Sequence, residues 1–169
     1  MYIIDHNKQL SLVKEMKQLR RNTQSCEVYY HHPFTNQMWK SFFPRAKEDN
    51  LGPKLLRHEP LPNTIEACLD ICLAEDAPEN AIGLGIEWST KATLWPEVIK
   101  ILEENYSDYL RGQLKLFLKH LDMEEAELGT IKETSSKPTT GNNDISGEEI
   151  DNLIWRSRKI RMKRFFVLG

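Results

Sequence analysis

Few side chains in this chain of 169 residues combine a reactive group with a spacing that suits catalysis or metal binding. Cys68 and Cys72 lie four apart on a predicted helix, a spacing that suits two metal ligands. No histidine lies within nine residues of them, and free cysteine is often a small core residue, so a buried pair is the simpler interpretation. His58 and Glu59 offer acid–base chemistry near neutral pH, although such a pair in a loop is more typical of ordinary surface.

The sequence patterns of known sites are incomplete here. The run GLGIEW at 83–88 begins like a dinucleotide-binding loop, but Trp88 stands where the third glycine belongs. Residues 142–153 imitate a calcium-binding loop, yet Leu153 occupies the position of the bidentate glutamate. His31 and His32 are adjacent, so on a strand they point to opposite faces. The sequence therefore predicts a protein that is not an enzyme, with no catalytic residues, no cofactor and no metal.

Charge is distributed unevenly along the chain, although the formal net charge is only −2. The net charge is +5 over residues 1–58, −9 over 59–108, −1 over 109–145 and +3 over 146–169. An acidic face could bind a basic partner, since complementary charge speeds encounter and supplies specificity. Alternatively, the acidic segment pairs with the basic ends of the same chain. The candidate partner-binding residues are Glu66, Asp70, Glu75, Asp76, Glu79, Glu103, Glu104 and Asp108.

The first part of the chain predicts one helix and one hairpin. Apolar residues recur at helical spacing over residues 7–21, which indicates an amphipathic helix with a basic outer side. Residues 26–32 and 38–43 have the composition of strands, and the PFTN turn at 33–36 joins them into a β-hairpin. Residues 44–62 contain four prolines and show no periodicity, which predicts a long loop.

The residues after this loop predict a layer of helices. Asn63 and Glu66 fit a capping box in front of an apolar stripe. Pro78 begins a second helix, whose glycines at 83 and 85 imply close packing against a neighbouring helix. Trp95-Pro96 opens a third helix, and the apolar stripe over 110–121 predicts a fourth. Short connections between the helices favour antiparallel pairs.

The composition of the chain changes after residue 123. Residues 124–145 are polar and predict a flexible linker. Residues 146–169 form a basic amphipathic element with six Lys or Arg in the nine positions 156–164. This element could contact the phosphates of nucleic acid or an anionic membrane surface. The simpler interpretation is a terminal helix or strand that docks on the acidic helices, because its apolar end favours burial.

Together these patterns predict an α+β, mostly α-helical fold. The expected domain spans residues 1–123, with the N-terminal helix and β-hairpin packed on a layer of antiparallel helices. The linker over 124–145 and the basic C-terminal element over 146–169 follow it. No apolar run approaches the roughly 20 residues of a membrane span, and the start of the chain lacks the basic region of a signal peptide. We therefore expect a cytoplasmic protein.

Residues 1–122 combine several local features, namely Tyr29-Tyr30, the PFTN turn at 33–36 with Trp39, the FPR step at 43–45, the PKLL run at 53–56 and the acidic helices. In this layout they resemble the immunity proteins of bacterial polymorphic or contact-dependent toxin systems. Such a family implies a small, non-enzymatic cytoplasmic protein that binds its cognate toxin and blocks the toxin's active site. These toxins are commonly nucleases with basic clefts, which the acidic segment would complement.

Two further expectations follow from the sequence. Trp88 or Trp95 is either an aromatic anchor for the toxin or a core residue, since aromatic residues dominate many interfaces. The alternative function is a helical scaffold or adaptor, whose basic residues 156–164 recruit nucleic acid or a membrane surface. The basic C-terminal element is the feature that departs from a uniformly acidic inhibitor. No small-molecule substrate is expected under either function.

Overall fold

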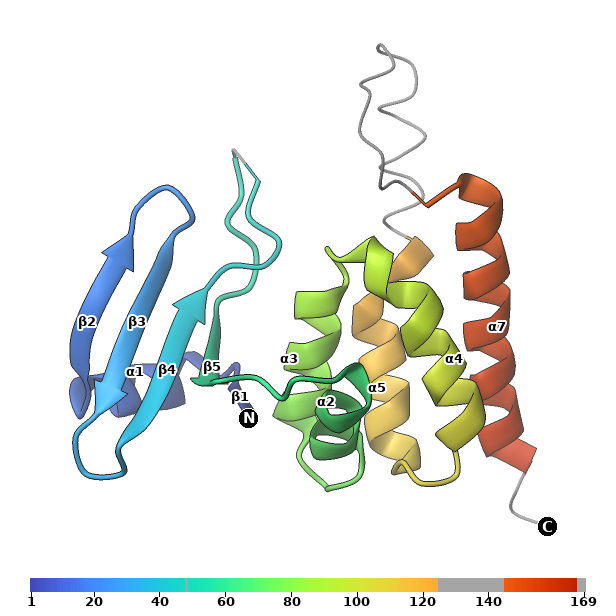
Figure 1. The fold of residues 1–169 in the computed structure, drawn as a ribbon, viewed down its shortest axis with the longest axis horizontal. Coiled ribbons are helices and arrows are strands. Elements are labelled where there is room, and N and C mark those ends of the chain that lie inside the picture. The colour runs from blue at the N-terminus through green and yellow to red at the C-terminus, as the bar shows by residue number, and fades with distance from the viewer. Residues whose placement is uncertain (48, 125–144, 167–169) are drawn as a thin grey trace.

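A computed structural model describes residues 1–47, 49–124 and 145–166 (Figure 1). These residues form an α+β fold of six α-helices and one five-stranded antiparallel sheet, and about half of them are helical. The sheet lies at one side of the molecule and the helices α2, α3, α4, α5 and α7 at the other. The predicted α+β class is confirmed, whereas the prediction of a mostly helical chain with a single hairpin is wrong.

The sheet has the strand order β1-β5-β4-β3-β2, and all of its pairs are antiparallel. The predicted hairpin forms its centre, as strands β3 and β4 joined by the PFTN turn. An isolated hairpin is marginal in water, and here three further strands extend it on both sides. The strands are β1 (Tyr2–Ile3), β2 (Lys17–Asn22), β3 (Glu27–His32), β4 (Gln37–Phe42) and β5 (Leu55–Glu59).

The segment predicted as one helix over 7–21 forms a helix in its first part and a strand in its second part. Helix α1 (His6–Lys14) ends after nine residues, and the chain then pairs with β3 as the edge strand β2. All six residues of β2 are exposed, so the helical spacing of apolar residues in this segment corresponds to no buried face. Strand β2 forms backbone hydrogen bonds to β3, and the Arg20 guanidinium stacks on the Tyr29 ring, 4.0 Å from the ring centroid. These contacts outweigh the helical spacing of the local sequence.

The long loop predicted over 44–62 contains a central strand. Strand β5 lies between β1 and β4, and its residues Leu55, Leu56 and Arg57 are buried. Proline cannot donate to a sheet, which makes it rare inside a central strand. Here Pro53 and Pro60 lie outside the two ends of β5, so they bound the strand and do not interrupt it.

The predicted layer of four helices is present. Pro78 is the first residue of α3, where its missing N–H costs no hydrogen bond. The residue that caps α2 is Thr64, not the predicted Asn63, since the Thr64 hydroxyl accepts from the Ala67 amide at 3.2 Å. A short 3-10 turn (Ala92–Leu94) precedes α4. The helices are α2 (Ile65–Leu73), α3 (Pro78–Trp88), α4 (Trp95–Asn105) and α5 (Arg111–Leu121).

Two glycines let α3 approach its neighbours closely. A Cβ atom on Gly85 would lie 2.8 Å from the Phe117 carbonyl oxygen on α5, which confirms the predicted close packing of helices. A Cβ atom on Gly83 would lie 2.5 Å from Cγ of Tyr2, so this glycine faces strand β1. Helix α3 therefore packs on the helical layer with one side and on the edge of the sheet with the other.

The basic C-terminal element is a helix, α7 (Gly147–Phe166), that packs against α4 and α5. It buries Ile150, Leu153, Ile154 and Ile160 in the same apolar core as those helices. The predicted docking on the acidic helices is confirmed, and the alternative of an added strand is wrong. The linker predicted over 124–145 lies, apart from its two end residues, outside the described residues.

None of the helices in the described ranges is both long enough and apolar enough to span a bilayer.

Candidate functional site

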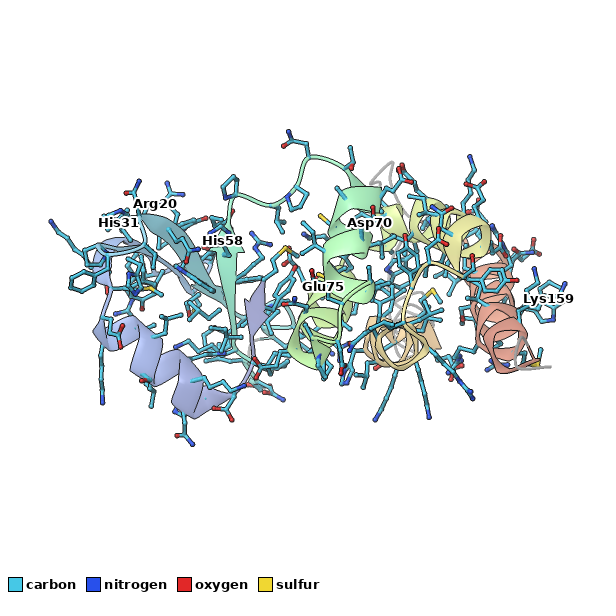
Figure 2. All side chains as sticks on the ribbon, turned by 90° about the horizontal axis from the view of Figure 1, so that it is seen from below. Arg20, His31, His58, Asp70, Glu75 and Lys159 are labelled. Atoms are coloured by element: carbon cyan, nitrogen blue, oxygen red, sulfur yellow. The ribbon has the colours of Figure 1, made fainter. Side chains whose placement is uncertain are left out.

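The charged segments of the chain occupy successive parts of the fold (Figure 2). Arg20 and His31 lie on the sheet at one end, and Lys159 lies on α7 at the opposite end. Asp70 and Glu75 lie between them, on α2 and just after it. The acidic segment is therefore central in space as well as in sequence, with a basic region on either side.

Four of the predicted partner-binding residues are exposed on α2 and on the turn that follows it. Glu66 and Asp70 lie one helical turn apart on α2, and Glu75 and Asp76 lie between α2 and α3. The chain has no lysine or arginine between Arg57 and Lys91. Like charges at a spacing of four cost a helix about 0.2–0.5 kcal/mol, so this arrangement does not stabilise α2.

The turn between α4 and α5 lies against this helix. The Leu110 amide donates to the Leu73 carbonyl at 2.9 Å, which joins the start of α5 to the end of α2. The Tyr109 hydroxyl donates to Asp70 at 3.2 Å, and the Asn105 amide donates to Glu66 at 3.4 Å. These contacts bring the exposed Asp108, in the same turn, beside the acidic residues of α2.

The carboxylates of α2 and its turn are held in place by neutral groups. Besides the Tyr109 and Asn105 contacts, the buried Gln113 donates to Asp76 at 2.9 Å. Burial and the Asp70 carboxylate raise the pKa of Tyr109, which therefore stays a neutral donor. These hydrogen bonds hold Glu66, Asp70 and Asp76 in place at the surface.

Two apolar side chains are exposed among these acids. Ile71 on α2 is 45% exposed, and Leu110 at the start of α5 is 40% exposed. Exposed apolar side chains beside charged ones are common at protein–protein interfaces. We call this region the acidic surface and define it by Glu66, Asp70, Ile71, Glu75, Asp76, Asp108 and Leu110.

Two other predicted residues are paired within the chain. Glu103 on α4 accepts from Arg156 on α7 at 3.0 and 2.6 Å, through both of its oxygens. The hydrogen bond from Arg156 lowers the pKa of Glu103. Glu79 on α3 forms an ion pair with Lys8 on α1 at 3.1 Å. For these two acids, the alternative prediction of pairing with the basic ends is confirmed.

Glu104 is exposed on the last turn of α4, and none of the hydrogen bonds or ion pairs given for the described residues joins it to α2. The structure thus gathers five of the eight predicted acids at the acidic surface, pairs two elsewhere and leaves Glu104 apart.

The two tryptophans considered as anchors are core residues. Trp95 is fully buried and its indole N–H donates to the Trp88 carbonyl at 2.8 Å. Trp88 is 3% exposed and packs edge-on against Phe117. The anchor interpretation is therefore wrong, because neither ring reaches the surface. Among the described residues, the large aromatic side chains that are exposed are Phe34 at the tip of the hairpin and Trp155 on α7.

The sequence did not predict a buried charged cluster that lies between the sheet and α3. Glu87 accepts from Arg57 at 2.5 Å through both oxygens, from Tyr2 at 2.8 Å and from Lys91 at 2.7 Å. Arg57 also donates to Glu59. Burial alone would raise the pKa of Glu87, but the positive charges of Arg57 and Lys91 hold this pKa below its ordinary value.

One sequence signal could have revealed this cluster. Glu87 interrupts an apolar stretch between Ile86 and Trp88, and a charge at a core position of a helix requires a partner. The partner could not be read from the sequence, because Arg57 lay in a segment predicted as a loop. The cluster joins the sheet to the helical layer.

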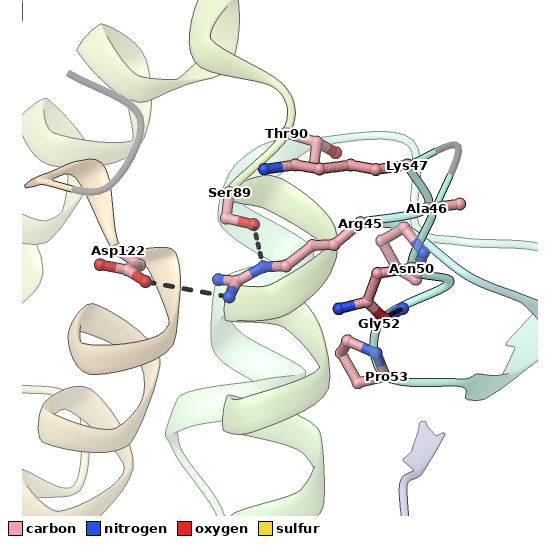
Figure 3. Close-up of a pocket in the computed structure, with 10 residues that line it drawn as sticks. Arg45, Ala46, Lys47, Asn50, Gly52, Pro53, Ser89, Thr90 and Asp122 are labelled. Atoms are coloured by element: carbon pink, nitrogen blue, oxygen red, sulfur yellow. Dashed lines mark hydrogen bonds and ion pairs between the residues drawn. The ribbon is translucent and has the colours of Figure 1, made fainter. Parts of the chain in front are cut away.

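A cavity of about 570 Å³ lies between the loop after β4 and the C-terminal ends of α3 and α5 (Figure 3). Arg45 crosses it, donating to the Ser89 hydroxyl at 2.8 Å and the His120 carbonyl at 2.7 Å, and lies 3.8 Å from Asp122. A cation at a helix C-terminus is favourable. Arg45 therefore stabilises these helix ends.

The cysteines and histidines form no reactive pair. Cys68 and Cys72 are buried as predicted, and burial raises the pKa of Cys72 to about 12. His58 packs edge-on against Trp39, with 5.4 Å between ring centroids. Glu59 is the next residue of the strand, where side chains alternate between faces, and bonds to Arg57. In the described residues, no three His, Cys, Asp or Glu side chains gather as a metal site requires.

No family model matches the chain, and neither a curated protein nor a solved structure is detectably similar to it.

Proposed function

We propose that this protein is a non-enzymatic immunity protein that binds a cognate bacterial toxin through the acidic surface and blocks the toxin's activity. The observation that carries the proposal is the exposure of Ile71 and Leu110 among carboxylates that are positioned by neutral donors. Such a surface offers both the apolar contact area and the negative potential that a basic protein binds. The positively charged nucleic-acid cleft of a nuclease toxin is the partner that it fits best.

The geometry also supports inhibition by simple binding. The acidic surface is formed by exposed residues of α2 and of two turns, so a partner can contact it directly. Of the predicted acids outside it, Glu79 and Glu103 are paired within the chain.

The test is binding to the toxin domain encoded beside this chain's own gene. Calorimetry with the purified domain should give a one-to-one complex, and co-expression should protect cells from the toxin. Ile71→Ala and Glu75→Lys should each weaken binding about tenfold or more, as central interface residues do. Glu97→Lys is the matched control, because it makes the same charge change at an exposed position on α4 outside the acidic surface.

The proposal fails if the toxin remains active in the presence of this protein. The acidic surface is the wrong one if Glu75→Lys and Glu97→Lys bind alike. The association rate should also fall with added salt, because electrostatic steering is screened.

The alternative function is an adaptor that uses basic residues 156–164, but several of these cations already make contacts within the chain. Arg156 is paired with Glu103, Arg158 bonds to Glu124, and Lys159 stacks on Trp155 at 3.9 Å. It stays a prediction, and binding of the chain to nucleic acid or anionic vesicles would support it.

A further inference from the structure

The outer face of α7 exposes side chains that core packing and helix propensity leave unexplained. Trp155 is 56% exposed and Met162 is 55% exposed, while the opposite face of the helix is buried against α4 and α5. Helix α7 lies at the edge of the molecule (Figure 1). Two large apolar side chains thus lie open to solvent on one face of the helix.

These residues belong to a continuous stripe along the helix. The steps from Glu148 to Asn152, Trp155, Lys159 and Met162 alternate between four and three residues. This alternation keeps side chains on one seam and is the pattern by which two helices pair along their length. All five residues are exposed.

The charges along the outer face change sign at Trp155. Glu148 and Asp151 precede it, and Arg158 and Lys159 follow it. Trp155 also lies near the middle of α7, which runs from Gly147 to Phe166. If a second α7 is laid antiparallel with Trp155 opposite Trp155, Asp151 of one helix meets Lys159 of the other, since each lies four residues from the centre. A parallel arrangement would instead place like charges together.

We propose that the outer face of α7 is a self-association site, through which two copies of this chain pair with their α7 helices antiparallel about a twofold axis. Twofold pairing uses the same patch on both subunits and therefore requires a patch that complements itself. The antiparallel charge order of α7 meets this requirement. The two Trp155 rings meet at the axis, and each Met162 packs beside the alkyl part of the other copy's Glu148.

A polyanion fits this face less well than a second copy does. Nucleic acid or an anionic membrane would favour cations along the whole helix, but Glu148 and Asp151 occupy its first half. Arg158 already bonds to Glu124, an exposed pair of low strength that a second copy can replace. Helix α4 lies between α2 and α7, so the dimer leaves the acidic surface open. The inference does not depend on the proposed function.

The test is the mass of the full chain in solution, by sedimentation equilibrium from micromolar to millimolar concentration. The wild type should rise from 19.8 kDa towards twice that mass. Trp155→Glu should stay monomeric across the series. Asp151→Lys and Lys159→Asp should each weaken dimerisation at least tenfold, and their combination should restore it, because the swapped charges complement each other again.

Lys115→Asp, a charge change at an exposed position of α5, is the control and should dimerise like the wild type. Circular dichroism should show each variant folded, since every altered residue is exposed. A wild type that stays at 19.8 kDa throughout overturns the proposal. So does a dimer that survives Trp155→Glu, or a charge swap that fails to restore pairing. Binding of a monomeric wild type to anionic vesicles or to DNA through Lys159 would overturn it as well.

Discussion

Arg57 on β5 donates to both carboxylate oxygens of Glu87 on α3, each at 2.5 Å. Both side chains are buried, and Tyr2 and Lys91 add two further donors to the same carboxylate. Arg57 and Glu87 therefore form the buried polar contact that connects the sheet to the helical layer.

Removing one partner of this pair should strongly destabilise the fold. Glu87→Ala leaves Arg57 buried without its main counter-charge, which typically costs about 3–5 kcal/mol in the free energy of unfolding. Urea denaturation followed by circular dichroism measures the loss. The double variant Arg57→Met with Glu87→Leu should recover most of it, because an apolar pair needs no counter-charge. If Glu87→Ala unfolds with the same free energy as the wild type, the Arg57–Glu87 contact does not stabilise the fold.

The Glu87 carboxylate should make the free energy of unfolding depend on pH. Its pKa is lowered in the folded protein from an ordinary value of 4.5, so the unfolded chain takes up the proton first as the pH falls. The stability that Glu87 contributes is complete above about pH 4.5 and is lost as the pH falls through the folded pKa. Glu87→Gln should be less stable at neutral pH and should lose less stability on acidification. Parallel pH profiles for the two proteins would contradict this.

Two glycines should respond in opposite directions to the same substitution. Gly83→Ala places a Cβ atom 2.5 Å from Cγ of Tyr2 and should cost about 1–3 kcal/mol, as overpacked cores do. Gly112→Ala on α5 meets nothing within 4 Å and should stabilise the helix by up to about 1 kcal/mol. Thermal melting of both variants checks the pair. If Gly83→Ala melts like the wild type, β1 does not pack against α3 as described.

The three cysteines should differ sharply in reactivity. Cys26 is exposed, whereas Cys68 and Cys72 are buried with raised pKa values, that of Cys72 to about 12. Since the thiolate is the reactive form, a thiol reagent at mildly alkaline pH should modify Cys26 rapidly and the other two only after denaturation. Mass spectrometry of the modified sites reads out the order. Rapid labelling of Cys72 in the folded protein would be inconsistent with its burial.

Local patterns predicted those elements whose stabilisation is itself local. Helices α3 and α4 begin at or beside a proline and bury a continuous apolar stripe, and strands β3 and β4 adjoin across a short turn. Strand β2 was missed because its partner β3 outweighs a helical spacing that corresponds to no buried face. Strand β5 was missed because the prolines around it suggested a loop, although they lie outside its ends.

For the candidate site, the sequence alone determined that acidic residues concentrate between positions 59 and 108 and that the ends of the chain are basic. Which of those charges stay available depends on contacts between segments that are distant in the chain. Glu87 is buried against Arg57, and Glu103 is paired with Arg156, in each case across at least thirty residues of chain. Asp70 is held by the neutral Tyr109 and keeps its charge at the surface. Ion pairing depends on distance in space, which the order of residues in a chain does not specify.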